Sequence, residues 1–277
     1  MMQPPQPNYD YDVAKLIKAY ESAFDRVLRE LERVDLDNFT RANQLATLKS
    51  IAEILAQLDV TAGDWAALHL EKAVQDGIVN AILALEVVSS VAEAEAIVTF
   101  NKINKALVES AIADTQADLL AVTQNVNKKV RASVRKVSSE VMRANLTRGI
   151  NGTQSLSRDI MAGLREELGA SLNSAIIDSA GRRWRPSHYV DVLVRTKMME
   201  AHRESTINEG VSRGALYGVV SRHGAKDDCA KWEGKVLKLV PDAPGDYTYV
   251  GDVPRRQLFH PCCKHTLSVV RKPERYA

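Results

Sequence analysis

The chain has 277 residues, 45% of them hydrophobic and 26% charged, proportions typical of a globular protein that buries a core. Its net charge of +2 predicts no nucleic-acid or membrane partner for the chain as a whole, so only local patches could bind either. We expect no membrane-spanning helix, because no apolar run approaches the ~20 residues required, and no secretory signal at the N-terminus.

Residues 1–9 are predicted to be a flexible arm, because prolines at three of the first seven positions cannot start a helix. A helical pattern begins at Asp10 and continues to about residue 148. Its first buried stripe consists of Leu16, Tyr20, Phe24, Val27, Leu28 and Leu31. Residues 35–38 are predicted to end this first helix, and residues 61–64 to form a turn after a second helix, with Thr61 or Asp64 as N-cap.

The segment from Trp65 to residue 148 contains one glycine, Gly77, and no proline. Long helices of about 20–40 residues are therefore predicted there, arranged as a bundle or an extended α-hairpin.

The last of these helices is predicted to carry a basic face opposite an apolar stripe. The stripe consists of Val126, Val130, Val134, Val137 and Val141. The basic residues are Lys128, Lys129, Arg131, Arg135, Lys136 and Arg143. Such a face could follow a phosphate backbone, although a solvated face or a subunit contact explains the same charges.

Residues 149–153 are the predicted domain boundary, because the glycines there interrupt the helical pattern. Beyond it, the pattern predicts helices at 154–168, 171–180 and 187–213, and strands at 217–221, 235–239 and 266–270. A loop before the last helix adds Arg182, Arg183 and Arg185 to the candidate nucleic-acid or partner contacts. The predicted fold is mainly α, with a helical domain at 10–149 and a small α+β module at 150–277.

All three cysteines and three of the six histidines lie between residues 223 and 265. Three cysteines, two of them adjacent, make a poor disulfide framework and favour synthesis in a reducing compartment. Zinc prefers four such ligands supplied as two closely spaced pairs, so His223 with Cys229 is one candidate pair. The other is Cys263 with His265, or His260 with Cys262. The alternative is that the cysteines are buried apolar residues and the histidines hydrogen-bonded structural residues.

Two further groups of residues are weaker candidates for a functional site. A cysteine beside a histidine could act as a nucleophile, but no signature of a cysteine hydrolase surrounds Cys229, Cys262 or Cys263. Arg195 lies on an apolar-rich helix and should pair with a carboxylate, for which Glu200, Glu204, Asp227 and Asp228 are the candidates. A structural ion pair explains Arg195 better than substrate binding does. No phosphate-binding loop occurs, so a packaging-motor ATPase is excluded.

Several segments in a fixed order resemble the tailed-phage minor capsid protein 2 family, which is related to the phage Mu F-like head-morphogenesis proteins. The segments are Gly181-Arg182-Arg183-Trp184, Val194-Arg195-Thr196, Val219-Val220-Ser221-Arg222-His223, Cys229-Ala230-Lys231-Trp232-Glu233-Gly234 and His260-Pro261-Cys262-Cys263-Lys264-His265. The resemblance covers roughly residues 150–270. It marks Arg195, Thr196, Trp232, Gly234 and His260 as structural residues of the family motif.

The chain departs from the Mu F-like pattern where relatives carry a Cys-x-x-Cys, because only Cys229 of that pair is present. A four-cysteine zinc site is therefore excluded, and the candidate ligands are His223, Cys229, Cys263 and His265.

The resemblance implies a non-enzymatic structural protein of the phage head, assembled in the bacterial cytoplasm and located in the capsid interior or at the portal vertex. Its implied partners are the portal protein, other capsid proteins, further copies of itself and packaged DNA, and it would act in procapsid assembly or in DNA packaging and ejection. The alternative is a zinc-stabilised nucleic-acid-binding protein without a capsid role. An enzyme is the poorer alternative, because almost no chain follows residue 270 to hold an effector domain.

Overall fold

A computed structural model describes residues 4–33, 41–147, 153–172, 176–178 and 180–276 of the chain. Two compact units form. One contains residues 14–65 and 116–191, and the other contains residues 1–13, 66–115 and 192–277. We call the first the helical unit and the second the mixed unit.

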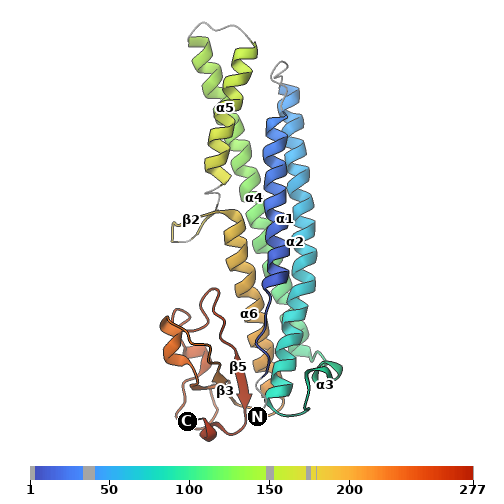
Figure 1. Ribbon diagram of the computed structural model, residues 1–277, viewed down its shortest axis with the longest axis vertical. Helices are drawn as coiled ribbons and strands as arrows, with labels where there is room; N and C mark the ends of the chain where they lie inside the picture. The colour runs from blue at the N-terminus through green and yellow to red at the C-terminus, as the bar shows by residue number, and fades with distance from the viewer. Residues whose placement is uncertain (1–3, 34–40, 148–152, 173–175, 179, 277) are drawn as a thin grey trace. The chain divides into compact units, whose positions relative to one another are not determined.

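The helical unit is built from four helices. They are parts of α1 (Asp10–Glu32), α2 (Arg41–Ala84) and α4 (Lys102–Thr147), together with all of α5 (Thr153–Leu172). In Figure 1, α1 runs beside α2, and α4 runs beside α5. The apolar stripe of α4 is buried at Val126, Val130, Val134 and Val137, as the spacing predicts.

A small hairpin follows α5 in this unit. Its strands are β1 (Ile176–Ile177) and β2 (Arg183–Trp184), which pair antiparallel. Asp178 holds the turn, because its carboxylate accepts hydrogen bonds from the backbone of Arg182 at 2.9 Å and from Trp184 Nε1 at 3.0 Å. Desolvation opposes ionisation of this carboxyl, but the hydrogen bonds outweigh it and hold the pKa of Asp178 at about 2.

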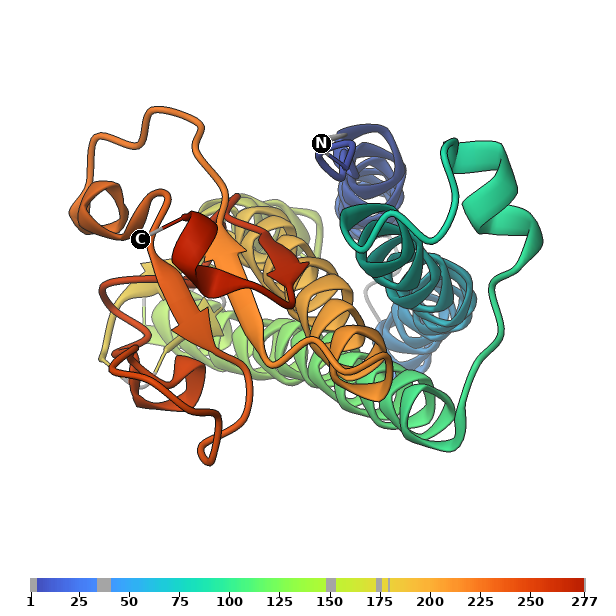
Figure 2. The ribbon, with the colours of Figure 1, turned by 90° about the horizontal axis from the view of Figure 1, so that it is seen from below.

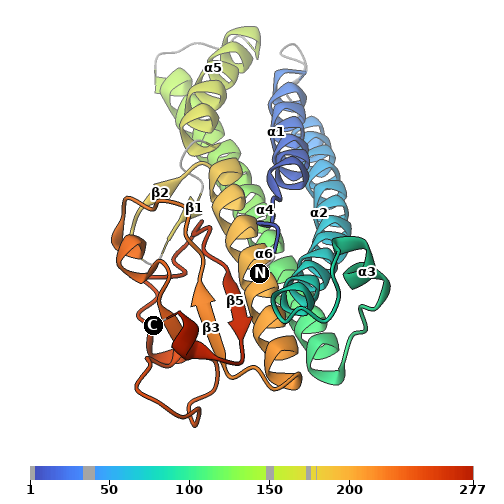
Figure 3. The same ribbon diagram turned by 60° about the horizontal axis from the view of Figure 1, so that its bottom comes forward.

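The mixed unit contains a three-stranded antiparallel sheet packed beside a helix. The sheet has the order β4 (Val236–Lys238), β3 (Tyr217–Val220) and β5 (Leu267–Val270). Most of α6 (Pro186–Ser212) belongs to this unit, and Figure 3 shows β5 beside part of this helix. The two approach closely because Gly210 has no side chain: a Cβ there would lie 2.6 Å from Val269 Cγ1. The sheet therefore buries its apolar face against α6.

A short helix, α3 (Val91–Ala96), lies in the connection between α2 and α4, which Figure 2 shows from below. Ser90 is the N-cap of this helix, because its hydroxyl accepts from the Glu93 backbone N–H at 3.2 Å, and Glu93 Oε2 in turn accepts from the backbone N–H of the preceding residue, Ser89, at 2.9 Å. This cap satisfies backbone donors at the helix start and fixes where the long helical segment is interrupted.

Helices α2 and α6 cross at Gly77 inside the mixed unit. A Cβ on Gly77 would lie 2.0 Å from Ser205 Oγ and 2.1 Å from the carbonyl oxygen of His202. The Thr206 hydroxyl donates to the Gly77 carbonyl at 3.0 Å, so the two backbones are tied together where they touch. A residue larger than glycine does not fit this crossing.

The predicted fold class is confirmed: the chain is mainly helical, with long N-terminal helices and a small C-terminal sheet formed by the three predicted strands. The predicted turn at 61–64 is wrong. Helix α2 continues through it, and the Thr61 hydroxyl donates back to the Gln57 carbonyl at 3.0 Å instead of capping a new helix. The helices are also longer than predicted, at 44 residues for α2 and 46 for α4.

Two other predicted boundaries differ from the structure or lie outside the described residues. Helix α5 runs through Gly169 to Leu172, and the segment predicted as a helix at 171–180 contains the hairpin strand β1. The predicted break at 35–38 lies outside the described residues, as do residues 149–152 of the predicted domain boundary. None of the helices within the described residues is both long enough and apolar enough to cross a bilayer.

Candidate metal centre

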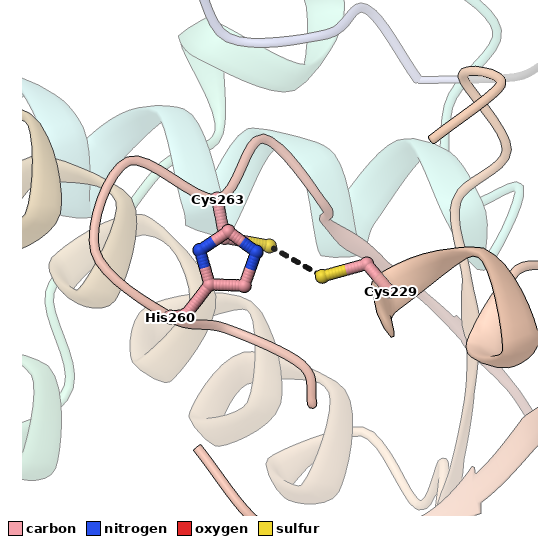
Figure 4. Close-up of side chains that lie close together, drawn as sticks. All are labelled: Cys229, His260 and Cys263. Carbon is pink, nitrogen blue, oxygen red and sulfur yellow. Dashed lines mark hydrogen bonds between the residues drawn. The ribbon is translucent and has the colours of Figure 1, made fainter. Parts of the chain in front are cut away.

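The cysteine and histidine residues of the C-terminal module come from a short helix and two loops. Cys229 lies in a 3-10 helix (Asp228–Trp232), which begins where the Asp227 carboxylate accepts the Cys229 backbone N–H at 3.0 Å. His260 and Cys263 lie in the loop that leads to β5, and Figure 4 shows their side chains facing Cys229. Phe259 and Cys262 in this loop have positive φ, at 60° and 61°. Such backbone angles are uncommon without glycine and often mark a functional constraint.

The first group of candidate ligands consists of Cys229, His260 and Cys263. Their ligand atoms all lie within 4.8 Å of one another, and the two Sγ atoms are 3.7 Å apart. Nε2 of His260 lies 3.2 Å from Asp227 Oδ2, so the same carboxylate contacts both Cys229 and His260. Cys229 and Cys263 are buried, with 1% and 7% of their surfaces exposed.

A second group consists of His223, Glu233 and His265. Nδ1 of His265 lies 3.3 Å from His223 Nε2, and Nε2 of His265 lies 3.4 Å from Glu233 Oε1. The same His265 Nδ1 is 3.3 Å from Cys263 Sγ, so His265 joins the two groups. His265 is buried, with 1% of its surface exposed, whereas His223 is exposed.

In this centre the pKa of the Glu233 carboxyl is lowered, whereas the pKa of the Cys229 thiol is raised. Hydrogen bonds from the backbone N–H groups of Ala225 and His223 hold the pKa of Glu233 at about 2. Burial, followed by the neighbouring Cys263, raises the pKa of the Cys229 thiol to about 12. Burial, followed by the neighbouring His223, lowers the pKa of His265. These shifts favour the neutral thiol at Cys229 and the neutral imidazole at His265, and a thiolate at Cys229 requires a positive partner.

The predicted ligands His223, Cys229, Cys263 and His265 lie along one chain of contacts, but the structure places His260 with the two cysteines and His223 with Glu233. Whether a metal binds stays a prediction. Two members of these groups are not predicted from the sequence. They are Glu233, and His260 as the partner of Cys263. The spacing His260-x-x-Cys263 could have revealed the first, because it separates two ligands by two residues as many structural zinc sites do. The Glu233 contact depends on tertiary folding and has no sequence signal.

The predicted pairing of His260 with Cys262 is not formed at the centre. Cys262 is exposed, and its backbone N–H donates to Thr196 Oγ1 at 3.3 Å. A cysteine–histidine pair does form at Cys263 and His265, but both side chains are buried. Their enclosure suits a structural role better than attack on a substrate.

The predicted family-motif residues have structural contacts in the mixed unit. Arg195 forms an ion pair with Asp10, a carboxylate that is not among the four predicted partners. The Thr196 hydroxyl donates to the Val192 carbonyl at 2.6 Å, and the Lys235 ammonium lies 5.0 Å from the ring centroid of Trp232. Gly234 has a φ of 76° and lies directly under the Arg222 guanidinium, where a Cβ would clash at 2.1 Å. Only glycine suits that position.

The predicted basic contacts lie in the helical unit, partly or fully exposed where the structure describes their side chains. Arg182 pairs with Asp178 at 2.6 Å, and Lys136 pairs with Glu167 at 3.2 Å. Burial and then the positive charge of Arg183 lower the pKa of Lys129, so α4 and the hairpin bring like charges together. The residues exposed on this surface are Lys128, Arg131, Arg135, Lys136, Arg143, Arg182, Arg183 and Arg185.

A family model described as phage minor capsid protein 2 matches residues 13–270. The match extends the resemblance from the C-terminal module to the long helices before it. Neither the curated proteins nor the solved structures contain a significant match to this chain.

Proposed function

The chain belongs to the phage minor capsid protein 2 family, and on this premise we propose that it is a minor head protein of the portal vertex, acting in procapsid assembly or in DNA packaging and ejection. Its role as a structural capsid protein, located in the virion, follows from the family. The observation that carries the proposal is the extent of the match, because residues 13–270 include both the long helices and the cysteine–histidine module.

The long helices support docking against a ring of neighbouring subunits. At a rise of about 1.5 Å per residue, a helix as long as α2 or α4 spans about 65–70 Å and offers an extended surface. Two large apolar side chains of α2 in the helical unit are exposed, Leu45 at 59% and Val60 at 57%. Single exposed apolar residues are common, but on one helix of a capsid protein they are the natural first contacts to test.

Co-expression with the portal protein of the same phage tests this role. We expect the two proteins to co-purify, and we expect Leu45→Glu and Val60→Glu to weaken the complex. The matched control is Gln57→Glu, which adds one negative charge at an exposed polar position of α2. Heads that assemble, package and eject DNA normally without this protein, with no portal complex, would contradict the proposal.

A second candidate function is contact with packaged DNA through the basic surface of the helical unit. No aspartate or glutamate occurs between Asp118 and Glu140, so the charges of α4 in this stretch are uniformly positive. The crowding of Lys129 and Arg183 favours an anionic partner, because like charges destabilise one another unless a counter-charge binds. Phosphates of DNA would supply that counter-charge.

The triple variant Lys128→Gln, Arg131→Gln and Arg135→Gln is expected to weaken DNA binding. If each residue binds a phosphate, the slope of log affinity against log salt should fall by about 0.9 for each of the three substitutions. The matched control is Lys18→Gln, Arg26→Gln and Arg29→Gln, which removes three charges from α1 of the same unit. Equal effects of both triples would argue against a dedicated surface. Strong DNA binding without any co-assembly with head proteins would favour the nucleic-acid-binding alternative.

A further inference from the structure

The two buried thiols of the mixed unit are spaced as two ligands of one metal ion. Their Sγ atoms are 3.7 Å apart. Two thiolates bound at the usual Zn–S distance of about 2.3 Å in a tetrahedron would be about 3.8 Å apart, whereas a disulfide would bring them to about 2.05 Å. The thiols are thus separated by the distance that a shared zinc ion requires.

Two histidines lie next to this pair of thiols, and Nε2 of each lies near a carboxylate oxygen. Nε2 of His260 faces Asp227 Oδ2 at 3.2 Å, and Nε2 of His265 faces Glu233 Oε1 at 3.4 Å. For His265, a hydrogen bond from Nε2 to the Glu233 carboxylate leaves Nδ1 with its lone pair, which is how histidine ligands of zinc are usually oriented. Nδ1 of His260 lies 3.0 Å from the Pro261 carbonyl oxygen, which requires an N–H at Nδ1 and leaves Nε2 as the nitrogen that could bind the ion. Nδ1 of His265 already lies 3.3 Å from Cys263 Sγ, close to the sulfur–nitrogen separation of about 3.5 Å expected in a tetrahedral zinc site.

We propose that Cys229, His260, Cys263 and His265 bind one structural zinc ion, with Glu233 as the carboxylate that orients His265 and the Pro261 carbonyl as the group that orients His260. This set replaces His223 with His260. The ring of His223 reaches the centre only through His265 and Glu233, at 3.3 and 4.0 Å. The proposal is separate from the capsid role and does not depend on it.

The charges of this set suit a buried site. Two thiolates balance the two positive charges of zinc, and two neutral imidazoles add none, so the complex is neutral where it is enclosed. Thiolates also select zinc over magnesium and calcium, which prefer oxygen ligands. The guanidinium of Arg203, on α6, lies over the Phe259 ring at 4.2 Å and adds a positive charge near the loop that carries His260 and Cys263.

The ion would close a long irregular segment. Between β4 and β5 the chain runs from residue 239 to residue 266 with a single turn of 3-10 helix, Val250–Asp252, as its regular structure. Loops of this length rarely hold one conformation without an anchor. Zinc bound to Cys229 on one side and to His260, Cys263 and His265 on the other would fasten the end of this segment to the 3-10 helix before β4.

Cobalt substitution of the full-length chain tests the site without any variant. Protein purified without chelators should contain one zinc per chain by elemental mass spectrometry. After exchange for Co²⁺, it should show the intense visible bands of a tetrahedral ion and a thiolate charge-transfer band in the near ultraviolet. Absence of metal, or an octahedral cobalt spectrum without a thiolate band, would overturn the proposal.

Variants then identify the ligands, with circular dichroism to confirm that each remains helical. Cys229→Ser, Cys263→Ser, His260→Ala and His265→Ala should lose bound zinc. Glu233→Gln should keep the stoichiometry but bind about 10- to 100-fold more weakly. The matched controls are Cys262→Ser and His223→Ala, which should retain one zinc. Loss of zinc in His223→Ala together with retention in His260→Ala would refute this ligand set.

Discussion

Replacing Gly77 with alanine is expected to destabilise the mixed unit by at least about 3 kcal/mol, because the added methyl group would overlap backbone atoms of α6. The new Cβ would lie 2.1 Å from the carbonyl oxygen of His202, and a backbone carbonyl on a packed helix cannot rotate away as a side chain can. The helices would have to separate, which would also break the hydrogen bond from Thr206 to the Gly77 carbonyl. Chemical denaturation of wild type and variant measures the effect.

Gly63→Ala is the matched control on the same helix. Its Cβ would meet only Gln116 Nε2, at 3.5 Å, so the intrinsic helix preference of alanine should stabilise α2 by up to about 1 kcal/mol. A second control separates the two clashes at Gly77. Ser205→Gly removes the serine oxygen at 2.0 Å but leaves the His202 carbonyl, so it should not rescue Gly77→Ala. Full rescue by Ser205→Gly would show that the backbone contact is not the cause.

Acidification from pH 7 to pH 4 is expected to lower the free energy of unfolding by about 3 kcal/mol through His202 alone. This side chain is buried on α6, and burial, followed by the charge of Arg203, lowers its pKa from 6.5 to about 4. As the pH falls below about 6.5, the unfolded chain takes up the proton while the folded chain does not. The stabilisation by neutral His202 is therefore complete above pH 6.5 and is lost progressively down to about pH 4.

His202→Gln isolates this contribution, because glutamine is polar and does not titrate. Other groups, including the proposed zinc ligands, also respond to acid, so the informative quantity is the difference in unfolding free energy between wild type and variant at each pH. That difference should change by about 3 kcal/mol between pH 7 and pH 4, to the disadvantage of the wild type. A difference that stays constant across this range would mean that His202 titrates normally in the folded chain.

Periodicity is enough to predict the helical class, the start of α1 at Asp10 and the three strands, because buried stripes and β-branched runs are local signals. It fails where tertiary packing outweighs local preference. Thr61 and Gly63 indicate a turn, yet neighbouring Ala62 and Trp65 are buried, and their burial keeps α2 continuous. The interruption near α3 escapes the same reasoning, although Ser90 and Glu93 carry the spacing of a capping box.

The site is predictable in its residue types and only partly in its grouping. Clustering of cysteines and histidines between residues 223 and 265 identifies the centre, but the contact between Cys229 and Cys263 spans 34 positions and depends on the sheet. Arg195 illustrates the same limit. Its need for a carboxylate is clear, but Asp10 is 185 residues away in the sequence, so no local reasoning can select it. Sequence patterns reveal which groups need partners more readily than which partners they find.

Cys262 offers a practical consequence for counting molecules in assembled heads. Of the three cysteines it alone is exposed, and the other two are buried. A maleimide reagent applied to native particles should therefore attach one fluorophore or gold cluster per chain, at a chemically defined point of the C-terminal module. In heads whose other proteins carry no accessible cysteine, the number of tags per particle would give the copy number of the protein, and their position in electron micrographs would show where in the head it lies.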